Sequence, residues 1–502
     1  MNLKEPKQVL EESTMMAATI AASRKVLPAF HCSDPAQSAQ RGTIPPRDRR
    51  LFPSRNRRLF PSRNRRIFPS RDRGFFPSRD REGAVSESLP NLLGNGSRST
   101  TTTQDRDLPS LSTPSRIITT RTRKAAPPLV LTACIVAAAC LNPALAQEDA
   151  APPDSWPMFR GSPHQTGVST ANLPDPIKLL WTTDVGEGVT STAAIHNGRV
   201  YFGCDDEKLH ALALKTGRPL WTYQALQPIQ SSPLVVGRTV YFGDDEGWLH
   251  AVNARSGEGR WAFQTASQII SSPTPFRHTI LFGSYDGFLY CLRGESGIVV
   301  WKYESEGRVH ASPAVVDDNI LFAGCDEYLH VVSANHGRLR RKVAMESVSG
   351  SSPAVVGDNV YVTTYGEQIR SINWKTGKPN WTFRDPDKAF PFLTSPAVAD
   401  GIVIAGGRDK IVHALDAKTG KEKWRFQTKG RIDSSAVIVG RRVFVGSSDG
   451  KLYELDLKTG KQRWQFDAGG PITASPAVVA GRLVIGTLDG AVYCFGGASS
   501  AR

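Results

Sequence analysis

The sequence predicts an all-β fold, an eight-bladed β-propeller with four short strands in each blade. A Gly placed four residues before a Trp recurs with a period of roughly 40 residues, as in "LDAKTGKEKWRF" and "LDLKTGKQRWQF". Most units also contain a Ser-Pro strand start and an Asp-Gly type pair that is typical of a tight hairpin. Four strands in roughly 40 residues are typical of a propeller blade, and such blades close around a central channel.

We expect residues 1–122, which precede the repeats, to be disordered. They are rich in Ser, Thr, Pro and Arg, and an eight-residue unit of the type "RRLFPSRN" repeats from Arg49 to Asp80. A Pro in every unit and arginines around an isolated Leu-Phe pair prevent a packed core. We interpret the segment as a solvated low-complexity stretch, with a basic arm for nucleic acid or membrane as the alternative.

Residues 123–146 are predicted to be a secretory signal peptide. A basic start is followed by an apolar run from Leu129 to Leu141, a Pro and the small-residue end "ALA", so cleavage is expected before Gln147. The apolar run is short of the roughly 20 residues that span a bilayer. A lipid anchor at Cys134, within "LTAC", is the less favoured alternative. Because signal peptides act at the N-terminus, we also expect translation to start after residue 1, and the mature protein to be periplasmic or in the cell envelope.

The positive charge of the chain belongs to this N-terminal part. The formal net charge is +15, but 24 Lys and Arg against 11 Asp and Glu lie in residues 1–146, which leaves 38 against 36 for the rest. A nearly neutral propeller has no electrostatic footprint for nucleic acid. We therefore expect no nucleic-acid partner for the propeller.

A lead-in over residues 147–175 precedes the propeller at 176–497 and a tail at 498–502. Each unit runs "SSP" with an apolar stretch, an alternating strand such as "TVYFG", a DG-type turn, a strand such as "LHAL", a TG turn and a strand that begins near the Trp. Arg341 holds the Trp position of one unit. The Trp side chains are large enough to act as wedges between blades. These anchors are Trp181, Trp221, Trp261, Trp301, Trp381, Trp424 and Trp464.

The count of units predicts how the ring closes. Eight strand starts of the Ser-Pro type are present, two of which, near Ser191 and Ser434, have Ala in place of the Pro, but the last unit ends at "AVYCFGG" without a Trp strand. The first Trp strand, at Trp181, has no preceding three strands. We therefore predict that the Trp181 strand completes the last blade and removes the free edges of the ring.

The units "HALDAKTGKEKWRF" and "YELDLKTGKQRWQF" resemble the PQQ-type propeller repeat. That family includes quinoprotein dehydrogenases and the propeller lipoprotein of the bacterial outer-membrane barrel-assembly machine. The lead-in "WPMFRGSPHQTGVS" is similar to the start of exported bacterial proteins of this class. The resemblance implies the fold far more specifically than an activity.

The chain departs from the enzymes of this family at their site chemistry. The resemblance implies PQQ beside a disulfide of adjacent cysteines, a Ca²⁺ site and an Asp base, but none of the seven cysteines are adjacent. We therefore expect no cofactor, with PQQ as the less favoured alternative, and no catalytic residue. Four histidines occupy one repeat position, which suggests a metal ring, but tyrosines fill the same position in other units. We interpret that position as packing, and we expect no metal. The histidines are His210, His250, His330 and His413, and the tyrosines are Tyr290, Tyr453 and Tyr493.

Two features depart from the repeat and supply the candidate partner-binding residues. The connection after Trp381 is three residues longer than the others and offers Phe390 and Phe392, which bind a partner or, alternatively, fold back over the channel. The residue at the entry to the innermost strand varies between units, which is typical of a position that recognises a ligand. We favour the alternative that this variation is merely tolerated at a solvent-filled channel mouth. The remaining candidates are Gln230, His310 and Asp433 at this position and Trp248, Tyr285 and Phe288 near the DG turns.

The sequence thus favours an exported, non-catalytic propeller scaffold that binds a protein or cell-envelope partner and is a monomer. The first alternative is a quinoprotein-type dehydrogenase with a degenerate or unfamiliar site. The second is an extracytoplasmic sensor module that acts with a separate kinase. We expect the binding surface on the face that carries the DG turns and the Phe390 connection.

Overall fold

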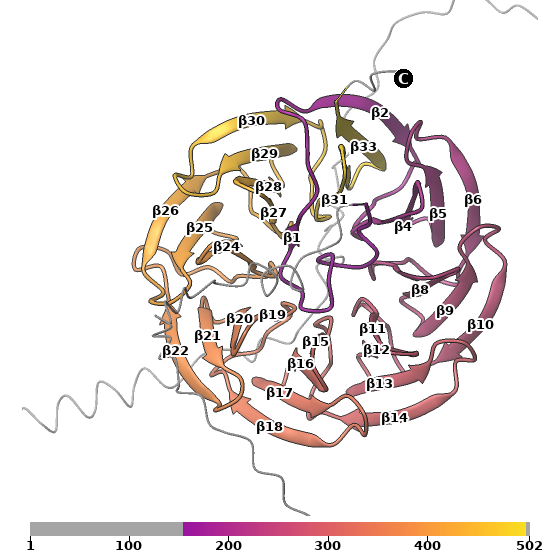
Figure 1. The fold of residues 1–502 in the computed structure, drawn as a ribbon, viewed down its shortest axis with the longest axis horizontal. Coiled ribbons are helices and arrows are strands. Elements are labelled where there is room, and N and C mark those ends of the chain that lie inside the picture. Colours follow the sequence, from indigo (N-terminus) through magenta and orange to yellow (C-terminus); the bar gives the residue numbers. More distant parts are fainter. Residues whose placement is uncertain (1–153, 498–502) are drawn as a thin grey trace, which may run out of the picture. The chain divides into compact units, whose positions relative to one another are not determined.

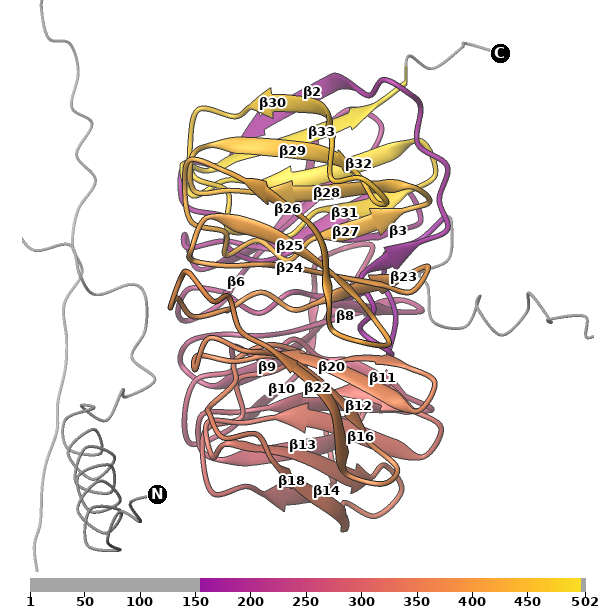
Figure 2. The ribbon, with the colours of Figure 1, turned by 90° about the vertical axis from the view of Figure 1, so that its left-hand side faces the viewer.

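The computed structural model describes residues 154–497, and in this range every regular element is a β-strand. Eight sheets stand around a common axis as the blades of a propeller, as predicted (Figure 1). The outer strands form the rim of the ring in Figure 1, and Figure 2 shows the ring from the side. The predicted disordered segment, the signal peptide, Cys134 and the tail lie outside the described residues.

Each of the first four blades is a regular antiparallel meander, and its strands are numbered from the channel outwards. Blade 1 holds β3 (Ala194–His196), β4 (Arg199–Gly203), β5 (Lys208–Ala213) and β6 (Pro219–Gln224), and blade 2 holds β7 (Leu234–Val236), β8 (Thr239–Gly243), β9 (Trp248–Asn253) and β10 (Gly259–Gln264). Blade 3 holds β11 (Thr274–Phe276), β12 (Thr279–Gly283), β13 (Phe288–Arg293) and β14 (Val299–Glu304). Blade 4 holds β15 (Ala314–Val316), β16 (Asn319–Ala323), β17 (Tyr328–Ser333) and β18 (Leu339–Ala344).

The last four blades repeat this order, except that the chain's first long strand enters the final one. Blade 5 holds β19 (Ala354–Val356), β20 (Asn359–Thr363), β21 (Ile369–Asn373) and β22 (Lys378–Phe383), and blade 6 holds β23 (Ala397–Ala399), β24 (Ile402–Gly406), β25 (Ile411–Asp416) and β26 (Glu422–Gln427). Blade 7 holds β27 (Val437–Val439), β28 (Arg442–Gly446), β29 (Lys451–Asp456) and β30 (Gln462–Asp467), with β1 (Val168–Ser169) beside it. Blade 8 holds β31 (Ala477–Val479), β32 (Arg482–Gly486), β33 (Ala491–Gly496) and β2 (Lys178–Asp184).

The ring closes by strand exchange, as the sequence predicts. Strand β2 is the outer strand of blade 8 and pairs antiparallel with β33, with Trp181 opposite Cys494. Figure 1 shows the indigo-purple β2 lying on the yellow blade. The first and last parts of the propeller are therefore joined by a full ladder of backbone hydrogen bonds.

The Trp and Gly of the repeat interlock neighbouring blades. The indole of Trp221 donates to the carbonyl of Ala254 in the next blade at 3.3 Å. Gly257, in the TG turn of that next blade, has a φ of +77°, and a Cβ there would lie 2.7 Å from the Trp221 ring. Only glycine satisfies both the turn and the close approach. The same contact joins Trp181 to Gly217, Trp261 to Gly297, Trp301 to Gly337, Trp381 to Gly420, and Trp424 to Gly460.

Arg341 fills the Trp position of blade 4 and keeps the contact with blade 5 through its guanidinium instead of an indole ring. Its guanidinium donates to the carbonyl of Thr376 in blade 5 at 3.1 Å, and its side chain lies against Gly377. An arginine stem covers apolar surface while its head hydrogen-bonds, so the exchange for Trp is tolerated.

The residue at the second position of each "SSP"-type motif, a Ser in seven blades and Thr192 in blade 1, takes part in a closed ring of eight hydrogen bonds around the channel. The hydroxyl of each accepts from the backbone N–H of the equivalent residue one blade earlier, at 2.9–3.2 Å, and Thr192 closes the circle with Ser475. The other members are Ser232, Ser272, Ser312, Ser352, Ser395 and Ser435. Buried hydrogen bonds of this kind fix the spacing of the blades at the axis.

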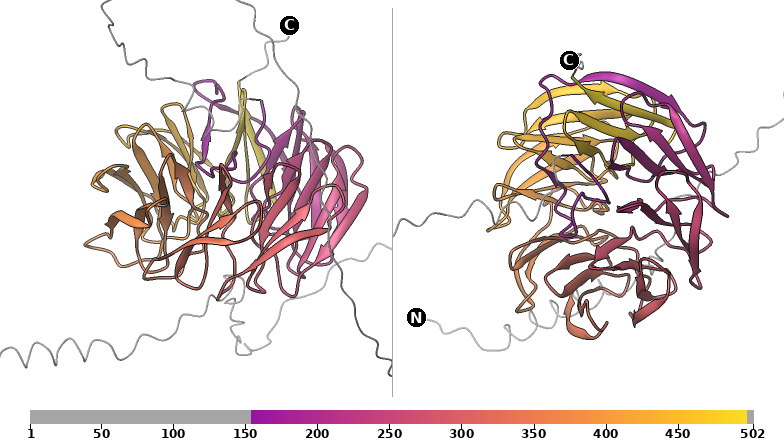
Figure 3. Two further views of the ribbon diagram at one scale, coloured as in Figure 1. Left: turned by 60° about the horizontal axis from the view of Figure 1, so that its bottom comes forward. Right: turned by 45° about the vertical axis from the view of Figure 1, so that its right-hand side comes forward.

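The lead-in runs around the inside of the ring and contacts the innermost strands of successive blades (Figure 3). Its backbone carbonyls accept from the N–H groups of Val235, Val315, Val355, Val398 and Ile438, which belong to blades 2, 4, 5, 6 and 7. Trp156 bridges to Ile195 of blade 1, and β1 runs parallel to β27. The three-residue inner strands would otherwise expose an unpaired edge to the channel.

Arg160 fixes the middle of the lead-in. It is fully buried and donates to the carbonyls of Ala436 at 2.7 Å and Pro396 at 2.8 Å. Burial lowers the pKa of its guanidinium to about 9. Gly167 makes room for it, since a Cβ at that position would overlap the guanidinium. The sequence identified the lead-in as a segment, but not its place inside the ring.

Candidate functional site

The predicted partner-binding residues gather on one face, which we name the DG face. It consists of the turns between the second and third strands and the connections from each outer strand to the next blade. Backbone hydrogen bonds join these two sets, for example from Tyr285 to Gln268 and from Arg408 to Pro391. The opposite TG face carries the turns between the third and fourth strands and those between the first and second.

The long connection between β22 and β23 separates the two predicted phenylalanines. Phe390 is 48% exposed, whereas Phe392 is 2% exposed. Phe392 packs edge-on against His413 with the ring centroids 5.4 Å apart, and its amide donates to the carbonyl of Thr364. The expectation that Phe392 is an exposed anchor is wrong, because its ring gains more by joining the core beneath the loop than by facing water.

An ionic cluster lies beneath this connection. His413 bonds Asp409 through Nε2 at 2.7 Å and Glu422 through Nδ1 at 2.8 Å, and Arg425 lies 3.2 Å from Asp385 of the long connection. Burial alone would lower the pKa of His413, but the two carboxylates outweigh it and the pKa is raised. An imidazolium with both nitrogens engaged has no lone pair for a metal. The cluster therefore serves as an ionic anchor for the loop.

A substitution in the repeat explains why this histidine differs from its equivalents. In blades 2 and 4 the second nitrogen of the histidine bonds a tyrosine hydroxyl of the preceding outer strand, Tyr223 or Tyr303. Phe383 occupies that place before blade 6 and offers no hydroxyl. Glu422 supplies the acceptor instead.

The predicted channel-mouth residues are engaged in polar pairs. Gln230 donates to Asp245 at 2.7 Å, and His310 lies 2.6 Å from the hydroxyl of Tyr285. Asp433 is held between Arg408 and Arg431, each at 2.9 Å. Each of these three side chains is therefore held by a charged or hydrogen-bonding partner in a DG turn.

The predicted aromatic residues near the DG turns are half-buried. Trp248 and Phe288 start the third strands of blades 2 and 3, and Lys302 lies 3.9 Å above the Phe288 ring. Tyr328 continues the row in blade 4 beneath Lys342, and we missed it in the sequence although the 40-residue spacing from Phe288 indicates it. Among the candidate residues, only Phe390 is more than a third exposed.

Two further surfaces were not predicted. A groove of about 790 Å³ on the TG face lies between blades 5 and 6, lined among others by Tyr361, Asn380 and Asp416. At the rim, Ile298, Val299 and Val300 are 60%, 39% and 48% exposed at the start of β14. The exposed apolar rim can be recognised in the sequence, because "GIVVWKY" is apolar where other units read "GKEKWRF".

Comparison with protein families decides the relationship. Overlapping matches over residues 175–304, 245–340, 285–428 and 408–500 identify the PQQ-repeat family described as outer membrane protein assembly factor BamB. The chain belongs to this family. The resemblance drawn from the repeat sequence is confirmed.

Solved structures share the fold at low identity. BamB from Moraxella catarrhalis is 19% identical with a TM-score of 0.57, covering 64% of this chain and all of its own. The quinohemoprotein alcohol dehydrogenase from Comamonas testosteroni is 14% identical with a TM-score of 0.60, covering 72% of this chain and 83% of its own. The computationally designed Ika8 protein is 17% identical with a TM-score of 0.56, covering 64% of this chain and 99% of its own. An assembly factor, an enzyme and a designed protein therefore share one scaffold.

Two findings complete the comparison. No curated protein matches the chain by sequence. Within residues 154–497, no helix with the length and apolar character of a membrane span occurs.

Proposed function

We propose that the protein is an exported, non-catalytic scaffold that binds another protein of the cell envelope through its DG face. The observation that carries this proposal is the long connection before blade 6, which presents Phe390 to solvent from an otherwise regular ring. An exposed aromatic side chain on a fixed backbone is a typical interface anchor. The family, described by an outer-membrane assembly factor, supports an envelope location and a protein partner.

The construction of the loop strengthens this argument. After Phe390 in the chain, Phe392 is buried. Before it, Lys388 donates a hydrogen bond to Gln427 at 3.1 Å. An anchor on a fixed loop loses little conformational entropy when it binds. The channel-mouth pairs around Asp433 and His310 would supply the polar rim of such an interface.

The test is a comparison of partner capture from envelope extract by wild type and surface variants, with captured proteins quantified by mass spectrometry. Phe390→Ala is expected to lose the specific partner. Lys418→Ala with Lys458→Ala on the TG face, and Ile298→Ser at the rim, are expected to keep it. If Phe390→Ala retains the partner and either control loses it, the DG face is not the binding surface.

A PQQ-dependent dehydrogenase is the second candidate, because enzymes of that class share the fold. The described residues do not fit that cofactor as the family's enzymes hold it. The four described cysteines, Cys204, Cys291, Cys325 and Cys494, are free, and the lead-in lies along the innermost strands inside the ring. A change in the absorbance spectrum on adding PQQ and Ca²⁺, with stoichiometric binding, would favour the enzyme over the scaffold.

A further inference from the structure

A pair of side chains recurs behind the DG turns and has a structural role. A histidine in the third strand bonds an Asp of the turn before it, and in blades 3 and 7 a tyrosine replaces the histidine. The pairs are His210–Asp206 at 3.0 Å, His250–Asp244 at 2.9 Å, His330–Asp326 at 2.8 Å, His413–Asp409 at 2.7 Å, Tyr290–Asp286 at 2.7 Å and Tyr453–Asp449 at 2.8 Å. This exchange shows that the pair itself fastens the turn and needs no ion.

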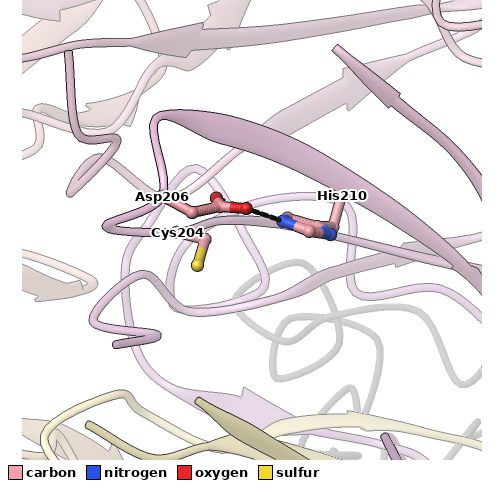
Figure 4. Close-up of side chains that lie close together, drawn as sticks. All are labelled: Cys204, Asp206 and His210. Atoms are coloured by element: carbon pink, nitrogen blue, oxygen red, sulfur yellow. Dashed lines mark hydrogen bonds and ion pairs between the residues drawn. The ribbon is translucent and has the colours of Figure 1, made fainter. Parts of the chain in front are cut away.

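Blade 1 adds a third donor to this pair. Cys204 directly follows β4, and its Sγ, a carboxylate oxygen of Asp206 and a ring nitrogen of His210 lie within 4.8 Å of one another (Figure 4). The equivalent positions in blades 3 and 4 hold Ser284 and Gly324. Thiolate, carboxylate and imidazole are the three donor types that zinc binds in proteins.

His210 also differs from the other histidines at its second nitrogen. Those in blades 2 and 4 bond a tyrosine of the preceding outer strand, but the strand before blade 1 offers Thr183, whose hydroxyl donates to Gly217 instead. A neutral ring can carry its proton on Nδ1 and present the Nε2 lone pair.

The surroundings favour a cation. Asp205, Asp206 and Glu207 are consecutive, so this one turn carries three carboxyl groups. Lys208 lies 3.0 Å from Asp206, but its side chain is more than a third exposed and can turn to solvent. A bound divalent ion would neutralise the negative charge of these carboxylates more fully than Lys208 alone does.

We propose that Cys204, Asp206 and His210 bind one divalent transition-metal ion of the zinc type. Tetrahedral zinc holds such donor atoms roughly 3.3–3.8 Å apart, given metal–ligand distances of about 2.0–2.3 Å, so small side-chain shifts complete the site. The thiol loses its proton on binding, and three protein ligands leave one coordination position for water or a partner's side chain. The thiol excludes calcium and magnesium as the preferred ions. This site goes beyond the scaffold function and does not depend on it.

The experiment titrates the metal-free full chain with Zn²⁺ and with Co²⁺, whose thiolate complexes absorb by charge transfer. Wild type is expected to bind one equivalent with this absorption. Cys204→Ser is expected to lose the band and weaken binding by more than about 100-fold, since even outer-shell changes cost about 10–100-fold. Cys291→Ser, which removes a buried thiol elsewhere, is the matched control and is expected to keep both.

A second variant guards against misfolding. His210→Tyr keeps the link to the turn, because Tyr290 and Tyr453 make that link in other blades, but it removes the imidazole ligand. It is expected to fold with wild-type circular dichroism and to lose the metal, while His330→Gln, in a blade without the thiol, is expected to bind it. Absence of binding to wild type, or unchanged affinity in Cys204→Ser and His210→Tyr, would overturn the proposal.

Discussion

At the scale of single residues, the TG glycine is fixed by a contact with the preceding blade. Gly257 and Gly237 both have positive φ in blade 2, but only Gly257 lies against a ring, that of Trp221. The two positions therefore separate the cost of backbone conformation from the cost of a steric clash.

Gly257→Ala is expected to lose about 1–2 kcal/mol for the left-handed conformation and about 1–3 kcal/mol more for overpacking against Trp221. Gly237→Ala, where no atom lies within 4 Å of the added Cβ, is expected to lose only the first part. Urea denaturation of both variants measures the difference. Equal losses would mean that the Trp contact does not restrict the turn.

The two phenylalanines of the long connection give a second residue-scale prediction. Phe392→Ala is expected to cost about 3–5 kcal/mol of unfolding free energy, because it empties a buried site. Phe390→Ala is expected to stay within about 0.5 kcal/mol, because the ring faces solvent. The same denaturation experiment checks both, and a large loss for Phe390→Ala would show that its ring packs in solution.

At the scale of elements, the long connection depends on the charge of His413. A histidine with a raised pKa contributes stability that is present in full below about pH 6.5, the usual value for the unfolded chain, and is lost as pH rises through the folded value. His413→Gln is therefore expected to lower the free energy of unfolding more at pH 6 than at pH 9.

The control for this prediction removes the partner instead of the histidine. Glu422→Gln takes away one carboxylate that raises the pKa of His413, so it should reduce the same pH dependence. Thermal melts of both variants at the two pH values are sufficient. A loss that is equal at pH 6 and pH 9 would contradict an ionised His413.

The repeat strands were predictable because their signals are local. The Ser-Pro starts, the TG turns and the Trp anchors each report a contact that the same unit makes in every blade. Phe392 could not be placed in this way, since its burial depends on a pocket formed by His413 and blade 5. The Cys204 cluster was hidden for a similar reason, because its histidine occupies a position that elsewhere fastens the DG turn through an Asp.

At the scale of the whole molecule, β2 is the element that closes the ring. Deleting Lys178–Asp184 is expected to expose the edge of β33 and to make the protein unstable or oligomeric. Trimming residues 498–502 is the control and should change neither property. Light scattering with thermal denaturation measures both effects, and a stable monomer without β2 would mean that the ring is held mainly by other contacts.

The lead-in has a consequence for how the protein is made. Its residues emerge early from the ribosome, yet Ser169 bonds Val478 across 309 residues and Arg160 bonds Ala436 across 276. Contacts between such distant residues form slowly, because a long loop must first be closed. A chain that stops before the last blade leaves both β2 and the lead-in without their final partners. The complete ring is thus available only to a chain synthesised through its last strand, because that strand supplies the partner of β2.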